Sequence, residues 1–221
     1  MSLSAYALIS RDELKAHVRA GGDSTDAQFD AIINRVTGEI ESYLGRWIVC
    51  PSGDTTRGSI TEYHTMQSDG LAVCSANLRT LEWPIIAMSH VYEDAAVPRT
   101  YGTELVAGTD YEVIKPLGIV RRIAGAGAPT YWNVGHRAIK LVYTAGYLTS
   151  AAAPEVIRSV ALRYAALIWD ESKRGAFGVS GASDSIGNFT RFTTAQITDD
   201  MRAALASERR PSAWTSGERD S

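Results

Sequence analysis

The hydrophobic residues between positions 26 and 45 recur at spacings of three and four. These apolar positions are Phe29, Ile32, Ile33, Val36, Ile40, Tyr43 and Leu44. Such a period puts them on one face of an α-helix, so the pattern predicts an amphipathic helix that ends at Gly45. Ser10 and Glu13 fit a capping box in front of a shorter helix over residues 10–19. Thr25 with Gln28 is expected to cap the longer helix.

From Pro51 to about Gly146 the pattern changes from the helical period to alternation along short β-rich segments. Turn sequences such as SGD, AGT and AGAGAP separate these segments. Six of the segments are typical of strands: ITEYHTM, LAVC, IIAMSHVYE, DYEVI, GIVRRI and AIKLVYT. Their hairpin-like spacing predicts an antiparallel, β-rich middle region.

The helical period returns after Pro154, which suits the first turn of a helix because its missing N–H costs nothing there. This third helix is predicted to end at Gly175. Its apolar face consists of Ile157, Val160, Ala161, Tyr164, Leu167 and Ile168. Thr198 is expected to cap a short last helix that carries Met201 and Leu205.

These elements predict an α+β protein with a small helical bundle core and a β-rich antiparallel insertion between the second and third helices. Residues 1–50 form an N-terminal helical hairpin, 51–150 the insertion, 151–208 the C-terminal helices of the core, and 209–221 a flexible C-terminal tail. The glycine-rich residues 175–189 are expected to form a mobile loop. The residues expected to pack the core helices together are Ile32, Ile33, Val36, Ile40, Ile157, Val160, Tyr164 and Ile168.

The balance of acidic and basic residues bears on whether the protein binds nucleic acid. The 221 residues include 22 Lys and Arg against 25 Asp and Glu, which gives a formal net charge of -3. Proteins that clamp DNA gain most of their affinity by neutralising phosphates, so they carry a basic excess. We expect no specific DNA binding. No apolar run approaches the ~20 residues that span a bilayer, and the first residues lack a signal-peptide pattern, so we expect no membrane partner.

Recognisable catalytic and metal-binding motifs are missing from the sequence. The four histidines, His17, His64, His90 and His136, lack metal-ligand spacings such as HxH or HxxxH. The AGAGA segment lacks the lysine of a phosphate-binding loop. We therefore assign no catalytic, cofactor-binding or metal-binding residue, and expect no enzyme activity and no cofactor.

Two alternatives from other functional classes stay open at this point. A small cytoplasmic hydrolase would need two of His64, His90 and His136 beside Cys74 or a carboxylate in one pocket. A carbohydrate- or peptide-binding β module would show an aromatic-lined cleft in the middle region. Trp214, alone in a polar tail, is either an exposed residue of a frayed end or an anchor for a partner's pocket.

The order of several segments resembles the head-tail adaptor (connector) proteins of long-tailed bacteriophages. The resemblance covers roughly residues 8–174, and the order of the motifs is more specific than any one of them. The matching segments are SRDELKAHVR, AQFDAIINRVTGEIESYLGRWI, LEWPIIAMSHVYED, DYEVI, IKLVYTAGY and PEVIRSVALRYAALIWDES. The β-rich middle is longer here than in the compact, mostly helical members of that family.

The resemblance implies a virion protein, made in the bacterial host cytoplasm, that forms a dodecameric ring under the portal protein. Such a ring extends the DNA channel, lets packaged DNA pass, and provides the docking surface for a stopper or tail-completion protein. Another neck component, such as the stopper, is the alternative within this class. Stoppers are usually β-barrels, so long helices at both ends of the chain argue against that alternative.

Similar adaptors dock to the portal largely through their C-terminal part, which corresponds here to Ile197 to Trp214. The resemblance assigns this role by region, because no motif in the tail aligns residue by residue. The implied docking residues are the apolar anchors Met201, Leu205 and Trp214 and the charge partners Arg202, Arg209 and Arg210.

Overall fold

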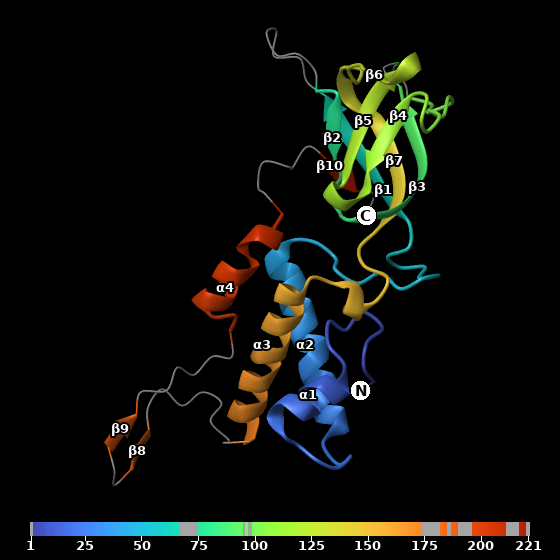
Figure 1. The fold of residues 1–221 in the computed structure, drawn as a ribbon. Helices are drawn as coiled ribbons and strands as arrows, with labels where there is room; N and C mark the ends of the chain where they lie inside the picture. Colours follow the sequence, from blue (N-terminus) through green and yellow to red (C-terminus); the bar gives the residue numbers. More distant parts are fainter. Residues whose placement is uncertain are drawn as a thin grey trace. The chain divides into compact units, whose positions relative to one another are not determined.

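The computed structural model describes residues 2–66, 75–94, 96, 99–173, 182–184, 187–189, 196–210 and 217–219. Contacts between Cα atoms divide the chain into a unit of Met1–Gly45 with Ser150–Arg209 and a unit of Arg46–Thr149 with Arg210–Ser221. We call them the helical unit and the β unit, after the elements that each contains (Figure 1). Helices and antiparallel sheets occur together, which confirms the predicted α+β class.

The helical unit begins with α1 (Arg11–Val18), whose predicted capping box is confirmed. The backbone N–H of Glu13 donates to Ser10 Oγ at 3.2 Å, and the N–H of Ser10 donates to Glu13 Oε2 at 2.6 Å. Helix α2 (Asp26–Leu44) ends at Gly45 as predicted, in the left-handed conformation that glycine adopts without strain (φ 68°).

The predicted side-chain cap of α2 is wrong. Thr25 precedes the helix, but its side chain makes no capping hydrogen bond. The backbone of Thr25 (φ -106°, ψ 2°) is not extended, and an extended backbone is what aims a capping oxygen at the first turn. The free N–H groups of Gln28 and Phe29 instead donate to the carbonyl oxygen of Thr25, both at 3.0 Å.

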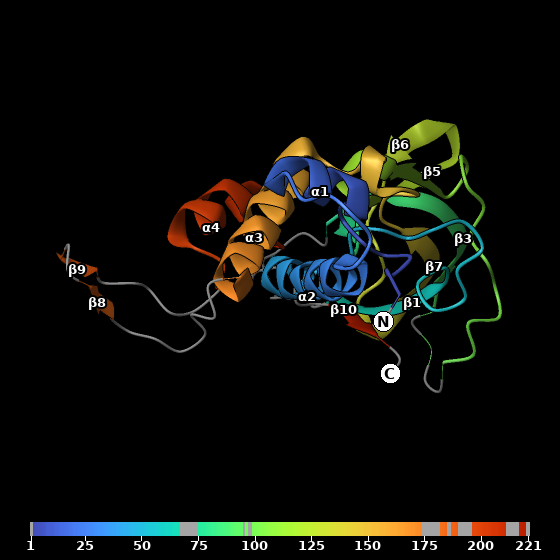
Figure 2. The ribbon, with the colours of Figure 1, turned by 90° about the horizontal axis from the view of Figure 1, so that it is seen from below.

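Helix α3 (Glu155–Lys173) follows directly on Pro154, and α4 (Asp199–Leu205) is capped by Thr198, whose Oγ1 accepts the N–H of Met201 at 3.4 Å. Figures 1 and 2 show α3 between α4 and the α1–α2 pair. The stop at Gly175 lies outside the described residues, as does most of the 175–189 loop. The short pair β8 (Ala182–Asp184) and β9 (Gly187–Phe189) is described within that loop. The eight residues expected to pack the helices are all buried in this unit: Ile32, Ile33, Val36, Ile40, Ile157, Val160, Tyr164 and Ile168.

The β unit contains two antiparallel sheets. The first has the order β10 (Gly217–Arg219), β1 (Ile60–Met66), β7 (Gly135–Ala145), β3 (Ile85–Glu93). The second has the order β2 (Asn77–Arg79), β5 (Ile119–Ala124), β4 (Tyr111–Ile114), with β6 (Ala128–Pro129) also on β5. Short 3-10 helices lie at Lys115–Leu117, Gly125–Gly127, Ser150–Ala152 and Ala206–Glu208. Five of the six predicted strands are confirmed; the sixth, LAVC, lies outside the described residues.

Apolar side chains from both sheets of the β unit pack into one cluster. Its buried members are Ile60, Leu78, Ile85, Val91, Tyr111, Val120, Trp132, Ile139, Leu141, Tyr143 and Ala145. Because every strand alternates its side chains between two faces, this core fixes which face of β1 and β7 turns inward. Among the described residues, the helices are too short or too polar to cross a membrane.

Candidate assembly surfaces

The C-terminal helix α4 turns its apolar residues into the helical unit. Met201 and Leu205 are 1% and 0% exposed, so neither forms part of the free surface. Arg202 is exposed, with its Nη1 3.6 Å from Asp199 Oδ1. Its carbonyl oxygen accepts a hydrogen bond from the Tyr43 hydroxyl at 3.2 Å, which ties α4 to the end of α2.

The two arginines that follow α4 belong to different units. Arg209 is exposed, and its guanidinium lies 5.3 Å from the ring of Tyr43 in the helical unit. Arg210 is assigned to the β unit, where its Nη2 donates to Glu82 Oε1 at 2.9 Å and to the carbonyl of Leu81 at 2.5 Å. Trp214, the remaining docking candidate, lies outside the described residues.

The partner of Arg210 belongs to a buried acidic network that was not predicted from the sequence. Glu62 and Glu82 are 0% and 1% exposed. Glu82 Oε2 accepts the N–H of Trp47 at 2.8 Å, and both oxygens of Glu62 lie 3.1 Å from the N–H of Leu81. The network therefore supplies each buried carboxylate with backbone donors, which is the condition for keeping a charge inside a protein.

Tyr143 joins the two carboxylates. Its hydroxyl donates to Glu62 Oε2 and accepts the N–H of Glu82 at 3.1 Å. Burial, together with the negative charge of Glu62, raises the pKa of Tyr143 well above its usual value. The sequence held a signal for this network: Glu62 and His64 occupy the same inward alternation as Ile60, which is unusual for charged residues.

The three histidines of the middle region each contact a different residue. His64 is 1% exposed, and its Nε2 contacts Glu62 in the core. His90 Nδ1 lies 2.9 Å from Glu104 Oε1 on the surface, and His136 Nδ1 lies 3.1 Å from Thr65 Oγ1. Cys74 lies outside the described residues. Within the part of the chain that is described, no group of three or more His, Cys, Asp or Glu is placed to hold a metal ion.

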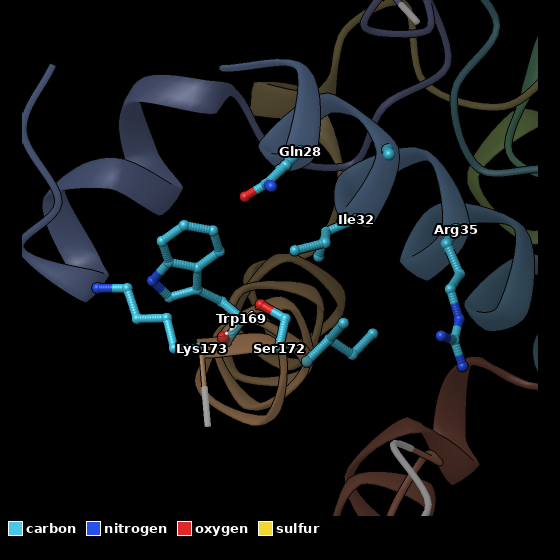
Figure 3. A pocket seen from close by; sticks show the side chains of 8 residues that line it. Gln28, Ile32, Arg35, Trp169, Ser172 and Lys173 are labelled. Carbon is cyan, nitrogen blue, oxygen red and sulfur yellow. Dashed lines mark hydrogen bonds between the residues drawn. The ribbon is translucent and has the colours of Figure 1, made fainter. Parts of the chain in front are cut away.

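A pocket of ≈ 400 Å³ opens on the helical unit between α2 and α3 (Figure 3). It is lined by Gln28, Ala31, Ile32, Arg35, Ile168, Trp169, Ser172 and Lys173. Trp169 is 5% exposed, packs on Phe29 with ring centroids 4.4 Å apart, and carries the ammonium of Lys173 at 4.9 Å from its ring. The pocket thus combines an apolar floor with a cation at its rim.

A second hollow of ≈ 360 Å³ lies between α2 and the segment that leads into α4. Its lining consists of Gly38, Glu39, Ser42, Tyr43, Gln196, Ile197 and Arg202. Glu39 is held here by Arg35, whose Nε donates to Glu39 Oε1 at 2.7 Å, and by the hydroxyl of Tyr164. Burial, and then the hydrogen bond to Glu39, raises the pKa of Tyr164 well above its usual value, so the phenol stays protonated as a donor.

Comparisons with known proteins show that this chain is similar in fold to chains of solved structures. No family model matches the chain, and no curated protein matches it. A chain of the solved structure "Neck of empty GTA particle computed with C6 symmetry" is 14% identical, with 95% of this chain and 94% of that chain covered and a TM-score of 0.51. A chain of "Virion of native gene transfer agent (GTA) particle" is 13% identical, with coverages of 95% and 92% and a TM-score of 0.53. The chain therefore shares its fold, over nearly its whole length, with a chain from the neck of a gene transfer agent particle.

Proposed function

We propose that this chain is a non-enzymatic head-tail adaptor of a phage-like virion. The observation that carries the proposal is the fold likeness to a chain from a particle neck, because it covers 95% of this chain. The order of motifs along residues 8–174 agrees with it. In this proposal copies of the chain form a dodecameric ring under the portal protein and extend the DNA channel.

A ring requires that one face of each subunit meets a different face of the next subunit. The helical unit offers two hollows with different charged residues in their linings, one with Arg35 and Lys173 and one with Glu39 and Arg202. These two faces support a heterologous contact between copies. The helical bundle is then the core of the ring, and the β-rich insertion faces outward or toward the stopper or tail-completion protein.

Portal docking is assigned to the C-terminal part of the chain. Arg202 and Arg209 are exposed and are available to an acidic partner surface. Met201 and Leu205 are buried, so they reach a portal only when α4 changes its packing. The net charge of -3 suits a conduit through which DNA slides without being held.

The deciding experiment mixes the purified chain with the portal ring of the same particle and images the product by cryo-electron microscopy. We expect twelve copies in one ring on the tail side of the portal. A ring that binds only below another neck protein would identify a stopper instead. A monomer that ignores the portal and turns over a small molecule would contradict the proposal.

A further inference from the structure

The pocket between α2 and α3 contains a buried hydrogen-bond donor that lacks an acceptor. Nε1 of Trp169 is buried, and it has no hydrogen-bond partner among the residues that the structure describes. Figure 3 shows this nitrogen on the side of the indole ring toward Lys173, whose ammonium lies 4.9 Å from the ring. A buried N–H without a partner is costly. An oxygen that enters the pocket beside Lys173 would therefore be stabilised there.

The lining of this pocket carries positive charge. Arg35 and Lys173 are its two cationic residues, and none of the other residues that the structure places in it is acidic. Arg35 already pairs with Glu39 at 2.7 Å, whereas Lys173 lies over the indole ring of Trp169. The pocket therefore fits an occupant that combines an apolar side chain with a carboxylate.

The opposite side of α3 presents such a combination. Leu167 is 45% exposed, although Ile168 next to it is buried. Asp170 and Glu171 follow Leu167 by three and four residues, which places both carboxylates on the same side of the helix. At about 100° per residue, Leu167 lies about 160° around the helix from Trp169. A copy therefore cannot place Leu167 in its own pocket.

The two sides of α3 are suited to a contact that repeats from copy to copy. A contact between one side of a helix and the opposite side of the next copy's helix is heterologous, as a ring requires. Leu167 and the pocket residues at positions 168–173 lie within about 9 Å along the helix axis. Two copies can therefore meet with their α3 helices at one level. The two carboxylates then come beside Lys173, and Arg163, one turn before Leu167, lies away from that cation.

We infer that the α2–α3 pocket receives Leu167 of the next copy in the ring. Asp170 and Glu171 of that copy then lie beside Lys173 and the N–H of Trp169. The inference rests on the proposed function and adds which surfaces join the copies. Three separate contributions favour this contact: the exposed leucine leaves water, the buried N–H gains an acceptor, and opposite charges approach.

The first test traps the contact with a disulfide between copies. In the double variant Leu167→Cys and Ser172→Cys, one thiol replaces the exposed leucine and the other lies in the pocket. The two thiols of one copy point away from each other around α3, so a disulfide joins them only between copies. Oxidation of the portal-bound protein should give a ladder of covalent multimers on a non-reducing gel, with at least half of the chains linked. Reduction should return them to monomers.

The matched control is the double variant Leu167→Cys and Ser159→Cys, whose thiols lie on the same side of α3 and leave the pocket unchanged. It should give no ladder. Both variants are imaged on the portal before oxidation. If the Leu167–Ser172 variant forms a ring but gives no ladder, the pocket contact is overturned and the proposed function stays intact. A wild-type chain that never forms a ring on the portal would instead contradict the proposed function.

The second test reverses charges on the two sides of the contact in separate chains. Lys173→Glu alone brings like charges together at every contact, and so does the double variant Asp170→Lys and Glu171→Lys alone. In an equal mixture, an alternating ring restores opposite charges at every contact. We expect each variant alone to co-sediment with the portal at least fivefold less than wild type, and the mixture to recover to within twofold of wild type.

Mixing is decisive because it changes no interaction within a chain, so only a contact between copies can produce the recovery. Asp12→Lys, a charge reversal at an exposed residue of α1, is the control and should bind the portal as wild type does. Circular dichroism must show the wild-type secondary structure for every variant. If the folded variants bind no better when mixed, the pocket does not receive the acidic side of α3.

Discussion

Two buried glutamates, Glu62 and Glu82, are at the centre of the hydrogen-bond network inside the β unit. Glu62 and Glu82 lie inside an apolar core, and each is supplied with several donors by Tyr143, Leu81, Trp47 or Arg210. A buried charge is tolerated only when such donors replace the lost water, and it becomes a liability when one donor is removed. A substitution that removes one of these donors is therefore expected to lower the stability of the β unit.

The Tyr143 hydroxyl offers a direct test at this scale. Tyr143→Phe removes one donor from buried Glu62 and one acceptor from the N–H of Glu82. We expect a loss of about 1–3 kcal/mol in the free energy of unfolding, measured by urea denaturation at pH 7. Tyr131→Phe, at a position that is 57% exposed, is the control and should cost less than about 0.5 kcal/mol. Equal costs for both variants would contradict the network.

Glu13 predicts how stability depends on pH. Burial would raise the pKa of Glu13, but hydrogen bonds from Ser10 and the contact with Arg158 outweigh it and hold the pKa below its usual value. A depressed pKa means that the stabilisation is present above the ordinary glutamate range, near pH ~4.3, and is lost as the pH falls through the lower folded-state value.

The urea midpoint of the wild-type chain should therefore fall between pH 5 and 3, and that of Glu13→Gln should fall less. Denaturation curves at pH 7, 5, 4 and 3 give the comparison. Asp200→Asn, at an exposed residue in the first turn of α4, serves as the control and should follow the wild type. The interpretation is wrong if Glu13→Gln retains the full wild-type pH dependence.

At the scale of elements, long helices and strands could be predicted from the sequence, because a longer element repeats its hydrophobic pattern more often. The stripes of α2 and α3 each span about five turns, so their period could be read from the sequence and most of their burial follows from it. Leu167 is the exception: it was predicted on the apolar face of α3 and is 45% exposed. Strands β2 and β6 are three and two residues long and are held by pairing with β5, so they carry too little alternation to detect. Strand β10 lies in a polar segment, and its conformation depends on pairing with β1 rather than on its own residues.

Ser10 caps the start of α1 with its side chain, whereas Thr25 precedes α2 without capping it, so the two positions can be compared by mutation. Ser10→Ala should lower the free energy of unfolding by about 1 kcal/mol, because the Ser10 hydroxyl accepts the Glu13 N–H. Thr25→Ala should cost less than half of that, because Thr25 makes no side-chain cap. Thermal unfolding of the two variants side by side measures the difference. A larger loss for Thr25→Ala would show that the cap forms in solution after all.

At the scale of the whole molecule, the fold class and the order of the elements could be predicted from the sequence. The burial of the apolar residues of α4 and the partner of Arg210 could not. The resemblance implied, by region, that Met201 and Leu205 are docking anchors, but apolar residues on a short helix serve an internal core equally well, and both are buried. The resemblance implied Arg210 as a charge partner in portal docking, whereas its guanidinium donates to Glu82, which lies 128 positions away in sequence. Distant pairings of this kind depend on the tertiary fold.

The charge of the whole chain predicts weak contact with DNA. With a net charge of -3 and no basic excess, the chain gains little from the release of counterions. Fluorescence anisotropy with a labelled 30-base-pair duplex at 150 mM salt should give a Kd weaker than about 10⁻⁴ M, the weak end of non-specific binding. Micromolar binding that falls steeply with salt would indicate a basic face that the net charge conceals.

The helical unit is assembled from two stretches of chain with the β unit's main segment between them. On the ribosome, the apolar stripe of α2 therefore emerges long before α3 is made. At ordinary rates of translation that delay is on the order of ten seconds, during which the stripe faces water. The main segment of the β unit, residues 46–149, is made during this interval and has time to fold first. Chaperone binding to nascent chains that end before Glu155 should therefore be stronger than binding to those that extend past Lys173.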